Sequence, residues 1–276
     1  MTSHPPGKCC TIGVKHEGEA KGQMRNIGDI STYFSEPESK QHELAILLLP
    51  DAFGHEAINS QLIADQFAAN GYFAVMPDLF HGDPVVMERL AEGFDIMAWL
   101  QGPPGHLPPR VDPVVEAVIR EMKQNLGVKK IGAVGYCFGG KYVARFLAEG
   151  RGVDVGFTAH PSFVTPEELK GIAGPLSIAA AGTSSAPFTP LLRLSPHSTN
   201  PTPRASETDA IFPAPKRHET EEILAAMSVP YQINLFSDVD HGFAVRADLS
   251  KPPVRFAKEQ AFLQAVHWFN EFLGKP

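Results

Sequence analysis

The order of apolar segments along this sequence predicts an α/β fold, with a mostly parallel central sheet and helices on both of its faces. Strand-like and helix-like patterns alternate from about residue 43 to the end, as they do when helices connect parallel strands. Several strand-like segments are apolar throughout, which is typical of strands buried on both faces. A sequence of 276 residues is long for one domain but common for a single α/β domain, so we expect one domain over residues 1–276.

The predicted strands are short apolar segments bounded by turn-forming residues. Glu43–Leu49 reads ELAILLL and stops at Pro50, so it is typical of a buried central strand. The other strands are predicted, in chain order, at Tyr72–Pro77, Lys130–Val134, Val153–Thr158, Pro175–Ala181 and Tyr231–Phe236.

The predicted helices lie between these strands and after the last one. Ile58–Asn70 and Phe138–Ala148 are two of them. The clearest amphipathic helix has apolar residues at helical spacing and Gly127 placed to end it; these residues are Val111, Val114, Val115, Val118, Ile119, Met122 and Leu126. A closing helix is predicted from Phe262, Leu263, Val266, Phe269 and Leu273.

Composition and charge exclude several classes of partner. Apolar residues make up 43% of the sequence and charged residues 20%, with a net charge of −7, so nucleic acid and anionic membranes are poor partners. We find no leader peptide or membrane-spanning stretch and expect a cytoplasmic monomer or small homo-oligomer. The cysteines Cys9, Cys10 and Cys137 cannot form a disulfide framework, and Cys9, Cys10 and His16 lack the spacing of metal ligands, so we expect no bound metal.

One segment interrupts the alternation of strands and helices. Residues 182–206 are rich in Pro, Ser and Thr and lie where a strand-to-helix connection needs only a few residues. Two interpretations of this insertion stay open, a surface loop or lid and the translation of a retained intron. The second rests on codons that permit splice-like boundaries, and on the compact AAAETDAIFP turn that remains when the segment is removed.

The strongest local signal for chemistry is Gly135–Gly139, which reads GYCFG between a predicted strand and a predicted helix. This is the form of a nucleophile elbow, with Cys137 in the place of serine. The glycines and Gly140 allow strand and helix to approach closely, and the helix N-terminus favours a thiolate. A buried, inert cysteine is the less favoured alternative.

A nucleophilic cysteine needs a base and a group that orients the base. His241 follows the last predicted strand, as the base of this kind of site does, whereas His160 comes too early in the chain and is instead expected to line the pocket. For the acid we prefer Asp209, which follows strand 175–181 once the insertion is discounted. Asp238 and Asp240 are its competitors, but they lie very near His241 in sequence.

The sequence resembles the dienelactone hydrolase family of α/β-hydrolases, especially its fungal members. The stretches that carry the resemblance are LLLPDAFG (47–54), GYFAVMPDLFHGDP (71–84), GAVGYCFGGKY (132–142), HPSF (160–163), ETDAIFP (207–213) and DHGFAVR (240–246). The resemblance implies a triad of Cys137, His241 and Asp209, with no metal or organic cofactor, that hydrolyses a small ester or lactone.

Further site residues are expected around this triad. The backbone amides of Ala52 and Phe138 are placed to form an oxyanion hole. The resemblance implies that Asp51, where bacterial relatives carry glutamate, gates the thiol. The same relatives have arginines that grip a substrate carboxylate at the places of His81 and Val245, and here Arg246 follows one residue later. The residues expected to line the pocket are Phe53, His81, His160 and Phe243.

Other functions remain possible on this sequence. A broader carboxylesterase or thioesterase, or a tailoring hydrolase of a secondary-metabolite pathway, would use the same triad, and only the pocket would distinguish them. A non-catalytic binding protein is the alternative from another class, because the insertion lies next to Asp209 and could displace the acid.

Overall fold

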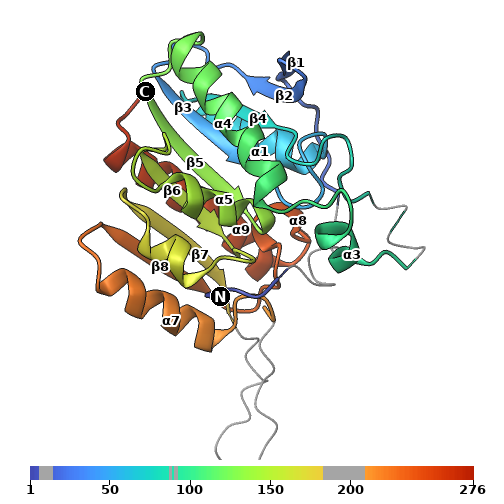
Figure 1. Ribbon diagram of the computed structural model, residues 1–276, viewed down its shortest axis with the longest axis vertical. Helices are drawn as coiled ribbons and strands as arrows, with labels where there is room; N and C mark the ends of the chain where they lie inside the picture. Colours follow the sequence, from blue (N-terminus) through green and yellow to red (C-terminus); the bar gives the residue numbers. More distant parts are fainter. Residues whose placement is uncertain (6–14, 87–88, 90–92, 183–208) are drawn as a thin grey trace, which may run out of the picture.

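The computed structural model describes residues 1–5, 15–86, 89, 93–182 and 209–276. Eight strands form one sheet in the order β1-β2-β4-β3-β5-β6-β7-β8 (Figure 1). Neighbouring strands from β4 to β8 run parallel, whereas β2 is antiparallel to both β1 and β4. The predicted α/β class with a mostly parallel sheet is therefore confirmed.

The strands and helices of the described ranges largely alternate along the chain. The strands are β1 (Gln23–Ile27), β2 (Ile30–Ser35), β3 (Leu44–Leu49), β4 (Phe73–Pro77), β5 (Lys130–Tyr136), β6 (Val155–Ala159), β7 (Leu176–Ala181) and β8 (Tyr231–Phe236). The helices are α1 (Ile58–Ala69), α3 (Ile96–Gln101), α4 (Pro108–Gln124), α5 (Phe138–Phe146), α6 (Pro166–Lys170), α7 (Ala214–Ala225), α8 (Phe243–Arg246) and α9 (Pro252–Phe272).

The two faces of the sheet each pack against a different set of helices (Figure 1). Along β3, Leu47 and Leu49 belong to the core under α4 and α5, and Ile46 and Leu48 to the core under α1 and α9. Successive side chains of a strand point to opposite faces, so a strand covered on both sides must be apolar at every position. This is why the strand sequence LAILLL is apolar at every position.

All six predicted strands and all four predicted helices are present, most of them with shifted bounds, whereas α3, α6, α7 and α8 were not predicted. Helix α9 begins at Pro252, ten residues before the apolar positions that predicted it, because a proline in the first helical turn loses no hydrogen bond. The hairpin of β1 and β2 is an addition to the predicted sheet. The predicted insertion at 182–206 lies outside the described residues, except for Gly182. No helix in the described ranges has the length and apolarity required to cross a membrane.

Helix α9 offers a matched test of the packing. The ring of Phe269 is buried against Tyr72 and Phe67, whereas Phe256 on the same helix is 59% exposed. We predict that Phe269→Ala lowers the free energy of unfolding by about 3–5 kcal/mol and that Phe256→Ala changes it by less than about 0.5 kcal/mol. Urea unfolding of both variants measures the difference, and equal effects would contradict this packing.

Candidate active site

The backbone of Cys137 is held in a strained conformation between β5 and α5. Its φ is +51° and its ψ is −110°, in a region that residues other than glycine rarely adopt. Its N–H donates to the carbonyl oxygen of Ala159 at 3.2 Å, and its own carbonyl oxygen accepts from Gly140 and Ser162 at 3.1 and 3.0 Å. These three hydrogen bonds fix the turn, and Cys137 is completely buried.

The glycines around Cys137 are required by close backbone contacts. A Cβ atom on Gly139 would lie 1.9 Å from the carbonyl oxygen of Leu49 in β3, and one on Gly135 would lie 2.6 Å from the carbonyl oxygen of Gly139. Distances this short cannot be relieved by a side-chain rotation. The pattern GYCFG thus reflects a crossing of strand and helix at backbone contact.

Asp209 and His241 form a buried pair at the ends of β7 and β8. The Nδ1 atom of His241 lies 3.1 Å from each carboxylate oxygen of Asp209, and both side chains are almost wholly inaccessible to solvent. The N–H groups of Ile211 and Phe212 donate to Asp209 at 2.9 and 3.0 Å. The competing carboxylates of Asp238 and Asp240 are exposed, so the structure pairs His241 with Asp209.

The electrostatics of this pair favour a charged imidazole. Burial alone would lower the pKa of His241, but the charges of Asp209 and Cys137 and hydrogen bonds to both outweigh it and hold the pKa well above its ordinary value. Burial alone would raise the pKa of Asp209, but the charge of His241 and the hydrogen bonds that the carboxylate accepts keep it below its ordinary value. Cys137, His241 and Asp209 therefore form one electrostatically coupled group.

The loop after β6 contributes two further buried side chains. The Oγ atom of Ser162 lies 3.6 Å from the Sγ atom of Cys137. The ring of His160 packs edge-on against His241, with 4.9 Å between centroids, and contacts Phe243 at 5.5 Å. Burial holds the pKa of His160 well below its ordinary value, so this second imidazole is neutral. The sequence did not predict that Ser162 lies near the thiol, and only the HPSF stretch pointed to this loop.

Asp51 and Arg246 form a second buried charged pair. The carboxylate of Asp51 accepts a hydrogen bond from Arg246 and another from the N–H of Phe53 at 3.0 Å. The guanidinium carbon of Arg246 lies 5.2 Å from the centroid of the Phe53 ring. Burial raises the pKa of Asp51, Arg246 opposes that rise, and the charge of Cys137 adds to it. Asp51 is therefore electrostatically linked to both Arg246 and the thiol.

The remaining predicted residues divide into two groups. Ala52 follows β3 and is fully buried, and Phe138 is the first residue of α5. The oxyanion hole expected from the amides of these two residues stays a prediction. His81 is exposed, and its ring hydrogen bonds with the carbonyl oxygen of Arg110 at 3.3 Å. The structure therefore places His81 at the surface, apart from the buried pair of Asp209 and His241.

Comparisons with known proteins show which proteins this chain is similar to. The model of the dienelactone hydrolase family matches residues 30–190 and 197–273. The hydrolase pyvD of Aspergillus violaceofuscus is 54% identical, with all of both chains covered, and the hydrolase tropI of Talaromyces stipitatus is 49% identical, with 99% of both covered. The fold resembles the crystal structure of a dienelactone hydrolase from Anabaena variabilis, with a TM-score of 0.59, 13% identity, and 93% of this chain and 99% of that chain covered.

The buried pair predicts how stability depends on pH. The folded pKa of Asp209 lies below 3.8, so the stability that it contributes is present above pH 3.8 and is lost as the pH falls through the folded value. The folded pKa of His241 lies above 6.5, so its contribution is complete below pH 6.5 and is lost as the pH rises through the folded value. Asp209→Asn should therefore reduce the free energy of unfolding most between pH 3.8 and 6.5.

Urea unfolding of the wild type and of Asp209→Asn at several pH values measures this effect. Asp240→Asn is the matched control, because Asp240 lies next to His241 in sequence but is exposed. If Asp240→Asn reproduced the pH-dependent loss and Asp209→Asn did not, the pairing would be wrong.

Proposed function

Because this chain belongs to the dienelactone hydrolase family and is an ester hydrolase, we propose that it cleaves a small ester or lactone with Cys137 as nucleophile, His241 as base and Asp209 as the group that orients the base. The observation that carries the proposal is the buried, coupled series from Asp209 through His241 to Cys137. An imidazole held by a carboxylate beside a thiol is the arrangement that activates a cysteine.

The first half of the proposed reaction forms a thioester. The Sγ atom of Cys137 attacks the ester carbonyl carbon, and the carbonyl oxygen becomes an oxyanion that accepts hydrogen bonds from the amides of Ala52 and Phe138. When the tetrahedral intermediate collapses, the bond between carbon and the leaving oxygen breaks. That oxygen takes a proton from the imidazolium of His241, and the acyl group stays on Cys137.

The second half releases the acid. His241 takes a proton from water, and the resulting hydroxide attacks the thioester carbonyl carbon at the same oxyanion site. The bond from carbon to sulfur breaks, and the thiolate regains the imidazolium of His241 as its partner. The raised pKa of His241 supports a resting thiolate–imidazolium pair, which needs no further proton transfer before attack.

The nucleophile is tested by comparing the wild type with Cys137→Ala and Cys137→Ser on a small activated aryl ester under reducing conditions. We predict that Cys137→Ala loses turnover by about 10³-fold or more. Mass spectrometry after a short incubation should place the acyl group on the peptide that contains Cys137 and not on the one with Cys9 and Cys10. If Cys137→Ala kept the turnover of the wild type, the proposal would be refuted. If the wild type and Cys137→Ala had equal rates near zero, the non-catalytic alternative would be favoured.

The buried pair of Arg246 and Asp51 supports a substrate that carries its own carboxylate. Such a substrate could replace Asp51 as the partner of Arg246, since arginine binds either carboxylate with the same two-pronged geometry. The freed Asp51 would then face the thiol that raises its pKa, which is how a carboxylate at this position could gate Cys137.

Arg246 and substrate charge can be varied together. We predict that Arg246→Gln lowers kcat/KM for a carboxylate-bearing ester by about 10-fold to 100-fold, with a much smaller effect on its neutral methyl-ester analogue. The double variant Arg246→Gln with Asp51→Asn is the control, because it leaves no unpaired carboxylate in the core. Equal losses on both substrates, restored by the double variant, would mean that Arg246 serves only to neutralise Asp51.

A further inference from the structure

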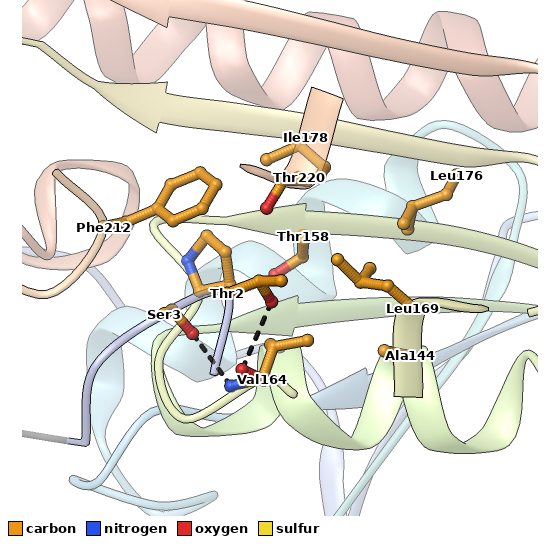
Figure 2. Close-up of a pocket in the computed structure, with 12 residues that line it drawn as sticks. Thr2, Ser3, Ala144, Thr158, Val164, Leu169, Leu176, Ile178, Phe212 and Thr220 are labelled. Atoms are coloured by element: carbon orange, nitrogen blue, oxygen red, sulfur yellow. Dashed lines mark hydrogen bonds between the residues drawn. The ribbon is translucent and has the colours of Figure 1, made fainter. Parts of the chain in front are cut away.

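Residues 1–4 lie between the loop after β6 and the turn that carries Asp209, and the two middle residues, Thr2 and Ser3, are buried. Thr2 and Ser3 are 1% and 0% exposed, which is unusual for polar residues. They line a small cavity with residues of α5, β6, β7 and the acid turn (Figure 2). In Figure 2 both side chains point toward Val164, and dashed lines join them to its backbone.

On one side this segment pairs with the loop after β6. The N–H of Ser3 donates to the carbonyl oxygen of Val164 at 3.2 Å, and the N–H of Val164 donates back to the Oγ atom of Ser3 at 2.8 Å. The Oγ1 atom of Thr2 donates to the same Val164 oxygen at 3.2 Å, and the N–H of Phe163 donates to the carbonyl oxygen of His4 at 2.8 Å. Phe163 directly follows Ser162, whose hydroxyl lies beside the thiol.

On the other side the segment holds the acid turn. The N–H of His4 donates to the carbonyl oxygen of Ile211 at 2.7 Å, while the N–H of the same Ile211 donates to the carboxylate of Asp209 at 2.9 Å. Phe212, the other residue whose N–H binds Asp209, lines the cavity with Thr2 and Ser3. Residues 2–4 thus bind one of the two residues whose N–H groups hold the Asp209 carboxylate and share a cavity with the other.

We propose that residues 1–4 act as a strap that positions the catalytic acid, by binding the Asp209 turn to the loop that carries Ser162. This inference rests on the proposed triad. Ser3 and His4 are positioning residues, because they reach the reacting groups only through Val164 and Ile211. Loss of the strap should loosen Asp209, and His241 should then lose the partner that keeps its ring charged and oriented.

Two variants of His4 separate the backbone hydrogen bond from the side chain. His4→Pro removes the N–H that binds Ile211, whereas His4→Ala keeps it and changes only a side chain that is exposed. We expect His4→Pro to lower kcat about tenfold or more with little change in KM, and His4→Ala to behave like the wild type. NMR titration of the His241 ring should show its pKa falling toward the ordinary value in His4→Pro alone.

A second pair tests the other side of the strap. Ser3→Ala leaves the buried N–H of Val164 without its acceptor, and Ser3→Thr restores a hydroxyl at the same place. The same loss of kcat and shift of His241 are expected for Ser3→Ala, with rescue by Ser3→Thr. If His4→Pro does not fold, Ser3→Ala and Ser3→Thr alone test whether residues 1–4 position Asp209.

The strap proposal fails if His4→Pro and Ser3→Ala lower the melting temperature but leave kcat and the titration of His241 unchanged. Residues 1–4 would then stabilise the fold without positioning the acid. Failure of the proposed function gives a different result, because Cys137→Ala would then keep the turnover of the wild type. In that case the titration of His241 would still show whether residues 1–4 hold Asp209 in place.

Discussion

The crossing of β5 and α5 over β3 is the constraint on which the rest of the site depends. Gly135 and Gly139 meet at backbone contact, and Gly139 also lies directly against the carbonyl oxygen of Leu49. With no room for a side chain on either glycine, the turn between them must be tight, and Cys137 takes the positive φ that results. The thiol is thereby fixed relative to the carboxyl ends of three neighbouring strands, where Asp51, Cys137 and His160 all lie.

Charge burial is the second feature that shapes the site. Asp209 with His241 and Asp51 with Arg246 place two ion pairs in the interior beside one thiol. A buried charge that loses its partner is strongly destabilising, so a change to one member of either pair is expected to lower the stability of the fold unless the other member changes with it. Because Asp51 and His241 both respond to the charge of Cys137, proton positions in the two pairs are coupled through the thiol.

Sequence patterns predicted the features that local chemistry determines. The apolar run Glu43–Leu49 and the GYCFG elbow each follow from a requirement that acts within a few residues, and both are where the sequence placed them. The hairpin of β1 and β2 was not predicted, because QMRNI is exposed along most of its length and has no apolar run. Contacts between distant segments were not predictable in the same way. No residue near Ser162 in the sequence indicates that its hydroxyl lies beside a thiol. The pairing of β5 with β6 brings Ser162 next to Cys137.

The two ends of the proposed triad are held by different kinds of interaction, and this difference bears on how the proposed site can vary. Cys137 is fixed by glycines and hydrogen bonds of its own strand and helix, so a change that moves it also disrupts the core. Asp209 is fixed by its own turn, and that turn is held in part through His4, about two hundred positions away in sequence. Loss of the orienting group in a serine triad costs about 10⁴ in turnover while the geometry of the fold survives. A change in the hydrogen bonds that hold the Asp209 turn can therefore alter the orientation of His241 without disturbing the crossing of β5 and α5, whereas a change that moves the backbone of Cys137 disturbs that crossing directly.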